Sequence, residues 1–367
     1  MKITSANLYM IDLPLRFPFS TSAGCLTSKD FILLSLTNED GETGYGECSA
    51  FTTPFYTEEF RGSALLLLKD CLLPAILNQE ITTPDQLQEL FSGIKRNNMA
   101  KAAVDTALWD LFAKQKHQSL AAAIGGNKKQ VLAGVSIGIQ NSPDQLVNKV
   151  RRYVQAGYQR VKVKIKPNAD YEYLKAVRDR FPGLMLMADA NSAYRLGDLD
   201  KLKRLDELKL IMIEQPLEAD DLLHHASLQR ELTTPLCLDE SINGLADAKA
   251  LFQLGSGKII NIKVGRVGGL TVARQIQAFA AKNGIECWCG GMLGSGVARA
   301  ADIAAAALPG YTLPNDISAS SRYFFQDIIT PEIVLHDGKI NVPTKPGIGF
   351  GLNWDVIHRY TVKKVSL

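Results

Sequence analysis

Five charged residues recur at nearly constant intervals through the middle of this 367-residue chain. They are Lys164, Asp189, Glu214, Asp239 and Lys263, and successive members lie 25, 25, 25 and 24 residues apart. A step of about 25 residues accommodates one strand, one helix and two loops, and each of the five closes a short stretch rich in apolar residues. In a parallel β/α barrel the carboxyl ends of the strands open on one mouth. The spacing therefore predicts that all five side chains surround a single cavity.

A strand-terminal polar residue that faces water is the ordinary alternative for any one of these positions. That alternative does not explain five residues at one spacing, with the acids in the middle and the lysines outside. We therefore treat the set as candidate functional residues.

The alternation of apolar runs and helical patterns predicts a complete barrel of the TIM type. Strands are expected near 131–137, 160–165, 185–189, 210–214, 236–239, 259–263, 285–288 and 311–314. Helices are expected between them, among others at 142–156, 220–231, 268–282 and 296–307. Eight strands that alternate with helices close a (β/α)7β barrel, an α/β fold.

The beginning and the end of the chain follow other patterns. Alternating apolar residues predict three antiparallel strands with a hairpin turn at 38–41, and an apolar i, i+3, i+4 stripe in 100–112 predicts a helix. We expect residues 1–125 to form an α+β capping domain and 126–318 to form the barrel. The irregular segment 319–367 is expected to pack back on the capping domain and complete it.

Composition narrows the range of partners and locations. The net charge is only +3, with basic and acidic residues interspersed, so no nucleic-acid-binding face is expected. Apolar runs such as 64–68, which charged residues follow at once, are far too short to cross a bilayer. None of the six cysteines forms a C-x-x-C pair, and no secretion-type segment begins the chain. We expect a cytoplasmic protein that acts on a small-molecule carboxylate, and leave homo-oligomerisation open.

The three acids of the series have the chemistry of a magnesium site. Asp189, Glu214 and Asp239 offer hard oxygen ligands, which suit Mg²⁺, or Mn²⁺, better than zinc. Three carboxylates around one cavity would raise one another's pKa unless a dication neutralised them.

The lysines complete a site for abstracting a proton next to a carboxylate. Lys162 and Lys164 share a face at the end of the second strand, and Lys263 ends the sixth, across the barrel. A metal-bound substrate carboxylate would have a lysine on each face of its α-carbon, and the metal would stabilise the enediolate formed there. A lysine beside a dication and a second ammonium can have its pKa lowered enough to act as a base. For Lys162, an ion pair at the barrel mouth is the alternative.

These residues carry a resemblance to a known superfamily. The motifs are Lys162-Val163-Lys164, Asp189-Ala190-Asn191, Glu214-Gln215-Pro216 and Asp239-Glu240-Ser241. Together with Lys263 they resemble the muconate lactonizing enzyme subgroup of the enolase superfamily, and the resemblance extends over the whole chain. The resemblance implies a capping domain that closes over a (β/α)7β barrel. Mandelate-racemase-type members use a histidine on the seventh strand, and 285–290 contains none, so the lysine–lysine subgroup fits better.

Four further segments narrow the resemblance. They are similar to the family of o-succinylbenzoate synthases and N-succinylamino acid racemases, and lie at 18–22, 134–139, 288–292 and 316–324. Dipeptide epimerases typically carry D-x-D after the eighth strand. This chain has Ser318 in place of the second acid, which counts against that activity. The family implies dehydration of 2-succinyl-6-hydroxy-2,4-cyclohexadiene-1-carboxylate to o-succinylbenzoate, in menaquinone biosynthesis. Racemisation of N-succinylamino acids is the alternative. A barrel protein that only binds a ligand, without catalysis, is a more distant alternative. Such a protein would be expected to have lost a metal ligand or a lysine, and none is missing here.

The resemblance also implies a role for each lysine. Lys164 would remove the α-proton and return a proton to the departing hydroxide, and Lys263 would stabilise the enediolate as a cation. Lys162 would help to hold Lys164 or the carboxylate. Arg266, three residues after Lys263, is expected to influence the pKa of that lysine through like-charge proximity.

Loops of both domains supply the candidate substrate contacts. We expect the capping loops at 18–22 and 51–56 to cover the substrate, although each residue in them could equally belong to an ordinary hairpin or to the core. The candidates are Thr21, Ser22, Phe51, Tyr56, Ser136, Asn191, Gly291, Met292 and Ser318. Two positions depart from the family pattern: many relatives have an acid where this chain has Gly294, and a glycine where it has Asn315.

Overall fold

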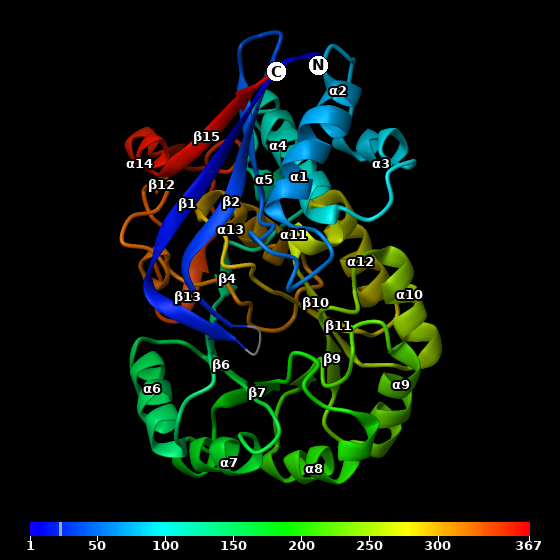
Figure 1. Ribbon diagram of the computed structural model, residues 1–367, viewed down its shortest axis with the longest axis vertical. Helices are drawn as coiled ribbons and strands as arrows, with labels where there is room; N and C mark the ends of the chain where they lie inside the picture. Colours follow the sequence, from blue (N-terminus) through cyan, green and yellow to red (C-terminus); the bar gives the residue numbers. More distant parts are fainter. Residues whose placement is uncertain (22–23) are drawn as a thin grey trace.

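The computed structural model of the protein describes residues 1–21 and 24–367 (Figure 1). Two main sheets organise the chain: a four-stranded sheet in the order β15-β1-β2-β3 and a seven-stranded parallel sheet that runs from β5 to β11. In Figure 1 the first sheet lies above the second, and the helices from α6 to α10 curve around the lower part. Among the described residues, no helix is long and apolar enough to span a membrane.

The antiparallel sheet forms the capping region together with a group of helices. Its strands are β1 (Ile3–Thr21), β2 (Gly24–Asn38), β3 (Thr43–Cys48) and β15 (Thr361–Ser366). The predicted turn after Asn38 is confirmed: the Asn38 side chain accepts hydrogen bonds from the backbone of Asp40 and Glu42, and Gly41 has φ of +81°. Alternate residues such as Leu8 and Ile32 enter the core of this region.

The helices of the capping region pack on one face of that sheet. They are α1 (Arg61–Leu67), a π-helical turn (Leu68–Leu72), α2 (Leu73–Ile76), a 3₁₀ turn (Pro84–Gln86), α3 (Leu87–Leu90), α4 (Asn98–Gln115) and α5 (Leu120–Ala123). Helix α4 is the one predicted from the apolar stripe. Gly46 lets it approach β3 closely, since a Cβ at Gly46 would lie 2.0 Å from the carbonyl oxygen of Ala103. The buried carboxylate of Glu59 accepts hydrogen bonds from two backbone N–H groups in the first turn of α4, those of Met99 and Ala100.

The parallel sheet is the wall of the predicted barrel. Its strands are β5 (Gly134–Ile137), β6 (Arg160–Lys164), β7 (Met185–Asp189), β8 (Ile213–Glu214), β9 (Leu236–Leu238), β10 (Ile259–Ile262) and β11 (Glu286–Cys289). Residues 311–316 close the barrel between β11 and β5. The backbone N–H of Thr312 donates to Cys287 (3.1 Å), that of Asp316 to Cys289 (2.8 Å), and that of Gly134 to Asn315 (2.6 Å).

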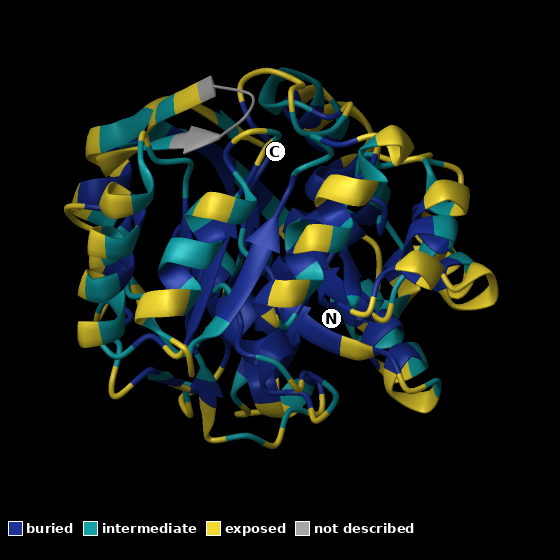
Figure 2. Ribbon diagram, turned by 90° about the horizontal axis from the view of Figure 1, so that it is seen from below, coloured by how far each residue is buried: buried dark blue, intermediate teal, exposed yellow. Residues whose placement is uncertain are grey.

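Helices surround the barrel, as the alternation predicted. They are α6 (Pro143–Gln155), α7 (Tyr171–Arg180), α8 (Leu199–Arg204), α9 (Leu222–Glu231), α10 (Leu245–Leu254), α11 (Val264–Val267), α12 (Leu270–Lys282) and α13 (Gly296–Ala306), with 3₁₀ turns at Leu196–Asp198 and Leu205–Leu208. The four helices predicted by range are present within two residues of their expected ends. In Figure 2 these helices expose their outer faces, while the strands inside are buried.

Three predicted strands differ in the structure, and the first of them, 210–214, is reduced to the two residues of β8. The segment 131–137 is divided: β4 (Gln130–Leu132) pairs antiparallel with β13 (Lys339–Asn341), and only β5 joins the barrel. The segment 311–314 forms no regular strand: Tyr311 makes one isolated bridge, to Cys287, and Pro314 has no N–H to donate to a ladder.

The end of the chain returns to the capping region. It contains a 3₁₀ turn (Ser320–Arg322), β12 (Ile329–Thr330), β14 (Gly351–Leu352) and α14 (Trp354–Tyr360), before β15 pairs with β1. The Trp354 ring packs edge-on against Tyr9, with centroids 5.6 Å apart. The domain limits 1–125, 126–318 and 319–367 remain a prediction.

Candidate active site

A cavity of about 310 Å³ lies where the capping region meets the carboxyl ends of the barrel strands. Nine of the predicted site residues line it: Phe51, Tyr56, Ser136, Lys162, Lys164, Asn191, Lys263, Gly291 and Met292. Ser318 is buried and is not among the lining residues. Ser22 and the side chain of Thr21 lie outside the described part of the chain.

The three predicted metal ligands lie at the ends of adjacent parallel strands. Asp189 ends β7, Glu214 ends β8, and Asp239 follows β9. Asp189 and Glu214 are direct neighbours in the sheet register, and all three residues have no exposed surface. The regular spacing in the sequence therefore corresponds to one buried acidic layer beneath the cavity.

Lys162 bridges two of these carboxylates. Its Nζ lies 3.1 Å from Asp189 Oδ2 and 3.1 Å from Glu214 Oε2. Burial alone would lower the pKa of Lys162, but Glu214 and Asp189 hold it well above its ordinary value. Burial and the neighbouring Asp189 raise the pKa of Glu214 to about 8. Lys162 is thus a fixed cation that is ion-paired within the acidic layer, as its alternative interpretation expected, and its role toward Lys164 or a substrate carboxylate stays a prediction.

Lys164 is held by groups that follow strand β7. Its Nζ donates to Asp189 Oδ2 at 2.8 Å and to the amide oxygen of Asn191. The amide nitrogen of Asn191 donates to Glu240 (3.1 Å), which orients the Asn191 side chain toward Lys164. Asn191 has φ of +41° and Ser192 φ of +61°, so the turn after β7 is left-handed at two successive residues.

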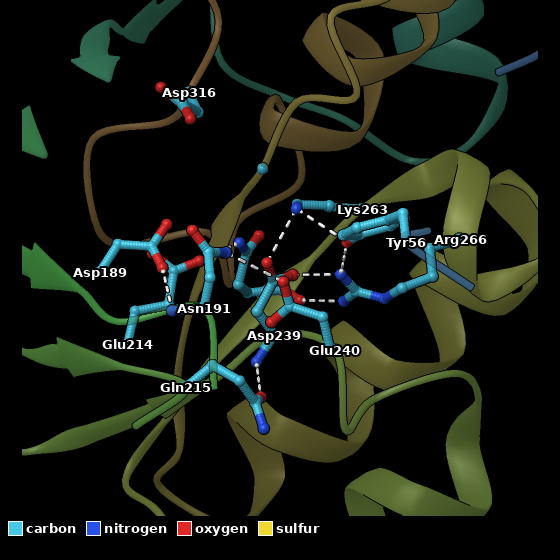
Figure 3. A network of polar contacts seen from close by, with 12 residues as sticks. Tyr56, Asp189, Asn191, Glu214, Gln215, Asp239, Glu240, Lys263, Arg266 and Asp316 are labelled. Carbon is cyan, nitrogen blue, oxygen red and sulfur yellow. Dashed lines mark hydrogen bonds and ion pairs between the residues drawn. The ribbon is translucent and has the colours of Figure 1, made fainter. Parts of the chain in front are cut away.

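Lys263 occupies the other side of the acidic layer (Figure 3). Its Nζ donates to Asp239 Oδ2 at 2.8 Å and to the Tyr56 hydroxyl at 2.9 Å. The Arg266 guanidinium contacts the other oxygen of Asp239. Although burial opposes both charges, Arg266 and Lys263 lower the pKa of Asp239, and Asp239 raises that of Lys263. The positive charge of Arg266 opposes this rise in the pKa of Lys263 without reversing it, so the predicted influence of Arg266 on the reaction stays a prediction.

The chemistry of the donor set, though not its spacing in this structure, suits a hard divalent cation. Asp189, Glu214 and Asp239 are oxygen ligands, and in the described residues their partners are basic side chains and the Asn191 and Asn261 nitrogens. Over the same residues, no three His, Cys, Asp or Glu side chains are gathered tightly enough to hold an ion. The raised pKa of Glu214 is the electrostatic condition that a dication would relieve.

Several lining residues were not among the predicted site residues. Asp316 accepts from Ser136 Oγ (2.7 Å) and lies 3.5 Å from Lys162 Nζ, and Glu240 contacts Asn191. Asp316 and Glu240 lie in the same sequence motifs as the predicted residues Ser318 and Asp239. Their place in those motifs was the signal that could have identified them. Arg299 and Asp302 also line the cavity, from the apolar helix α13, where no sequence motif marks them.

Comparisons with known proteins agree with this geometry. The chain matches the family model "Mandelate racemase / muconate lactonizing enzyme, N-terminal domain" over residues 4–125 and the model "Enolase C-terminal domain-like" over residues 145–356. It is 50% identical over 351 residues to an o-succinylbenzoate synthase of Geobacillus stearothermophilus, with 96% of this chain and 94% of that protein covered.

Other relatives have a second name or a solved structure. An N-succinylamino acid racemase of Thermus thermophilus is 45% identical over 362 residues, with 99% and 98% of the two chains covered. The crystal structure of an enolase superfamily member from Listeria innocua superimposes with a TM-score of 0.98 at 48% identity, covering 100% of this chain and 99% of that one.

Proposed function

Because this chain belongs to the mandelate racemase / muconate lactonizing enzyme family of the enolase superfamily, we propose that it is an o-succinylbenzoate synthase. It dehydrates 2-succinyl-6-hydroxy-2,4-cyclohexadiene-1-carboxylate to o-succinylbenzoate. One observation carries the proposal: Lys164 and Lys263 line one cavity from opposite sides of a layer of buried carboxylates. Relatives named o-succinylbenzoate synthase support this reaction among those that such a site can perform.

The reaction needs one base that becomes an acid. Lys164 removes the α-proton, and the electrons of the broken C–H bond become the new ring double bond as the C–O bond to the hydroxyl group breaks. Lys164 then returns the proton to the departing hydroxide, which leaves as water. Lys263 faces the opposite side as an ammonium, and Asp239 favours that charged form. Its charge stabilises the negative charge that develops on the substrate carboxylate.

The site would also hold a divalent metal, on which members of the superfamily depend. We propose Mg²⁺, with Mn²⁺ as a substitute, bound by Asp189, Glu214 and Asp239. When bound, the ion supplies fixed positive charge beside the substrate carboxylate. Lys162 contacts two of these carboxylates and favours the ionised form of each, although the pKa of Glu214 stays raised.

Racemisation of N-succinylamino acids is the second candidate. Two lysines on opposite faces of one α-carbon permit removal of the proton from one face and its return to the other. The relatives named N-succinylamino acid racemase favour this reaction as a further activity of the same site. We propose the cytoplasm as the place of action, since all six cysteines are unpaired, as is usual in a reducing compartment.

The decisive experiment compares both reactions in the same preparation. The kcat/KM for the cyclohexadiene substrate should exceed that for any N-succinylamino acid. Lys164→Ala should lower dehydration by about 10²–10⁴-fold, the usual contribution of an acid–base group, and leave the circular dichroism spectrum unchanged. Racemisation faster than dehydration would make the second candidate the main activity, and a Lys164→Ala variant with most of its turnover would exclude the mechanism.

A further inference from the structure

Tyr56 brings a group of the capping region into direct contact with the chemistry of the barrel. It lies in the irregular segment between β3 and α1 and lines the cavity. An aromatic cluster anchors the segment: the rings of Phe51 and Phe55 lie 4.8 Å apart, and those of Phe51 and Tyr56 lie 6.1 Å apart. Lys29 Nζ, buried in strand β2, lies 3.9 Å above the Phe51 ring. The Tyr56 side chain is therefore held from the capping side.

The Tyr56 hydroxyl is a shared acceptor for two cations. Lys263 Nζ and Arg266 Nη1 each donate to it at 2.9 Å, and Figure 3 shows both contacts converging on the phenol oxygen. A phenol oxygen has two acceptor sites, and these two donors occupy both. Hydrogen bonds from charged donors are stronger than neutral ones.

This arrangement fixes the direction of the Lys263 ammonium. Of its three N–H groups, one points to Asp239 and one to Tyr56. The third is thereby left for the cavity, where the substrate binds. Without the Tyr56 hydroxyl, the amine would keep one anchor and could rotate about it.

The other lysine has no such connection within residues 1–21 and 24–367. Its hydrogen-bond partners there are Asp189 and Asn191, which both belong to β7 and the turn after it. The capping region thus reaches one of the two lysines through a hydrogen bond, and the barrel alone holds the other.

We propose that Tyr56 is a positioning residue for Lys263 and not for Lys164, so that the capping segment controls the chemistry on one face of the substrate. The proposal rests on the proposed function, in which each lysine serves one face. Tyr56 acts through Lys263, and no proton of its own is transferred.

The test measures exchange of the α-proton of each enantiomer of an N-succinylamino acid in D₂O by NMR, under saturating substrate. Lys164→Ala and Lys263→Ala first identify which enantiomer each lysine serves. Tyr56→Phe should then slow exchange of the Lys263 enantiomer by about tenfold or more, because a hydrogen bond between a charged donor and its acceptor is lost, and change the other by less than about twofold. Tyr173→Phe is the matched control, since it makes the same chemical change at a hydroxyl that donates to the Asn141 carbonyl outside the cavity, and it should leave both rates unchanged.

A second measurement does not depend on turnover. Brief labelling of amines with acetic anhydride, followed by peptide mass spectrometry, should show faster modification of Lys263 in Tyr56→Phe and an unchanged rate at Lys164. Equal slowing of both enantiomers, or equal labelling of Lys263 in wild type and variant, would overturn the proposal. A wild-type protein that neither exchanges nor dehydrates would instead count against the proposed function, and the labelling result would still decide the role of Tyr56.

Discussion

Replacing Lys162 by methionine should destabilise the metal-free protein, because it leaves the buried acidic layer without its bridging cation. The Lys162 Nζ lies 3.1 Å from Asp189, 3.1 Å from Glu214 and 3.5 Å from Asp316, and only 4% of its side chain is exposed. Removing one partner of a buried ion pair costs about 3–5 kcal/mol. Protonation of Glu214, whose pKa is already about 8, relieves part of that cost, so we expect a value near the lower limit. Methionine keeps the apolar volume of the lysine stem.

Thermal unfolding followed by circular dichroism measures this loss. For a chain of 367 residues, a loss of about 3 kcal/mol corresponds to a fall in Tm of roughly 4 °C. Added Mg²⁺ should raise the Tm of the variant more than that of the wild type, because the ion replaces the missing charge. Lys175→Met is the control: that lysine forms an exposed pair with Asp179 on α7, and its loss should leave Tm almost unchanged. An unchanged Tm in Lys162→Met, or equal stabilisation of both proteins by Mg²⁺, would refute the reasoning.

Two further predictions concern the metal and pH. Exhaustive treatment with EDTA should abolish dehydration, and Mg²⁺ or Mn²⁺ should restore it, whereas full turnover in metal-free buffer would exclude the metal site. Burial raises the pKa of Asp105 from 3.8 to about 7, against hydrogen bonds from Thr271 and Leu270. Between these pH values the folded state binds a proton that the unfolded state has lost, so the contribution of Asp105 to stability falls as pH rises from about 4 to 7. Asp105→Asn should remove this dependence of the unfolding free energy on pH, which is worth at most about 4 kcal/mol at 1.36 kcal/mol per pKa unit. Urea unfolding of wild type and variant at pH 4 and pH 8 measures it, and the same pH dependence in both proteins would show that the assignment to Asp105 is wrong.

The sequence predicted the barrel well because its signals are local. Each of the five charged residues stands at or just after the end of a barrel strand, so topology alone places Asp189, Glu214 and Asp239 at the ends of adjacent strands. The deviations arise where distant segments compete for a strand. Residues 130–132 pair with 339–341, a partner that nothing in the local pattern indicates.

Contacts within the site were less predictable than its membership. Lys162 has a long side chain whose partner depends on the neighbouring strands, so the sequence left an ion pair open as the alternative to a role in binding. Lys263 and Tyr56 are 207 residues apart, and their hydrogen bond depends on how the capping region sits on the barrel. No periodicity in the sequence describes that docking.

The separate origins of the reacting and the enclosing side chains bear on how such an enzyme can diversify. The lysines and acids lie at the barrel strand ends, whereas Phe19, Leu26 and Phe51 come from the antiparallel sheet and the segment after it. Substitutions in the enclosing strands can therefore alter which molecules fit while leaving the proton-transfer groups in place. Tyr56 is the exception, since a change there would alter both fit and reactivity. We expect laboratory evolution toward new substrates to accumulate changes at Phe19, Leu26 and Phe51 while retaining Tyr56.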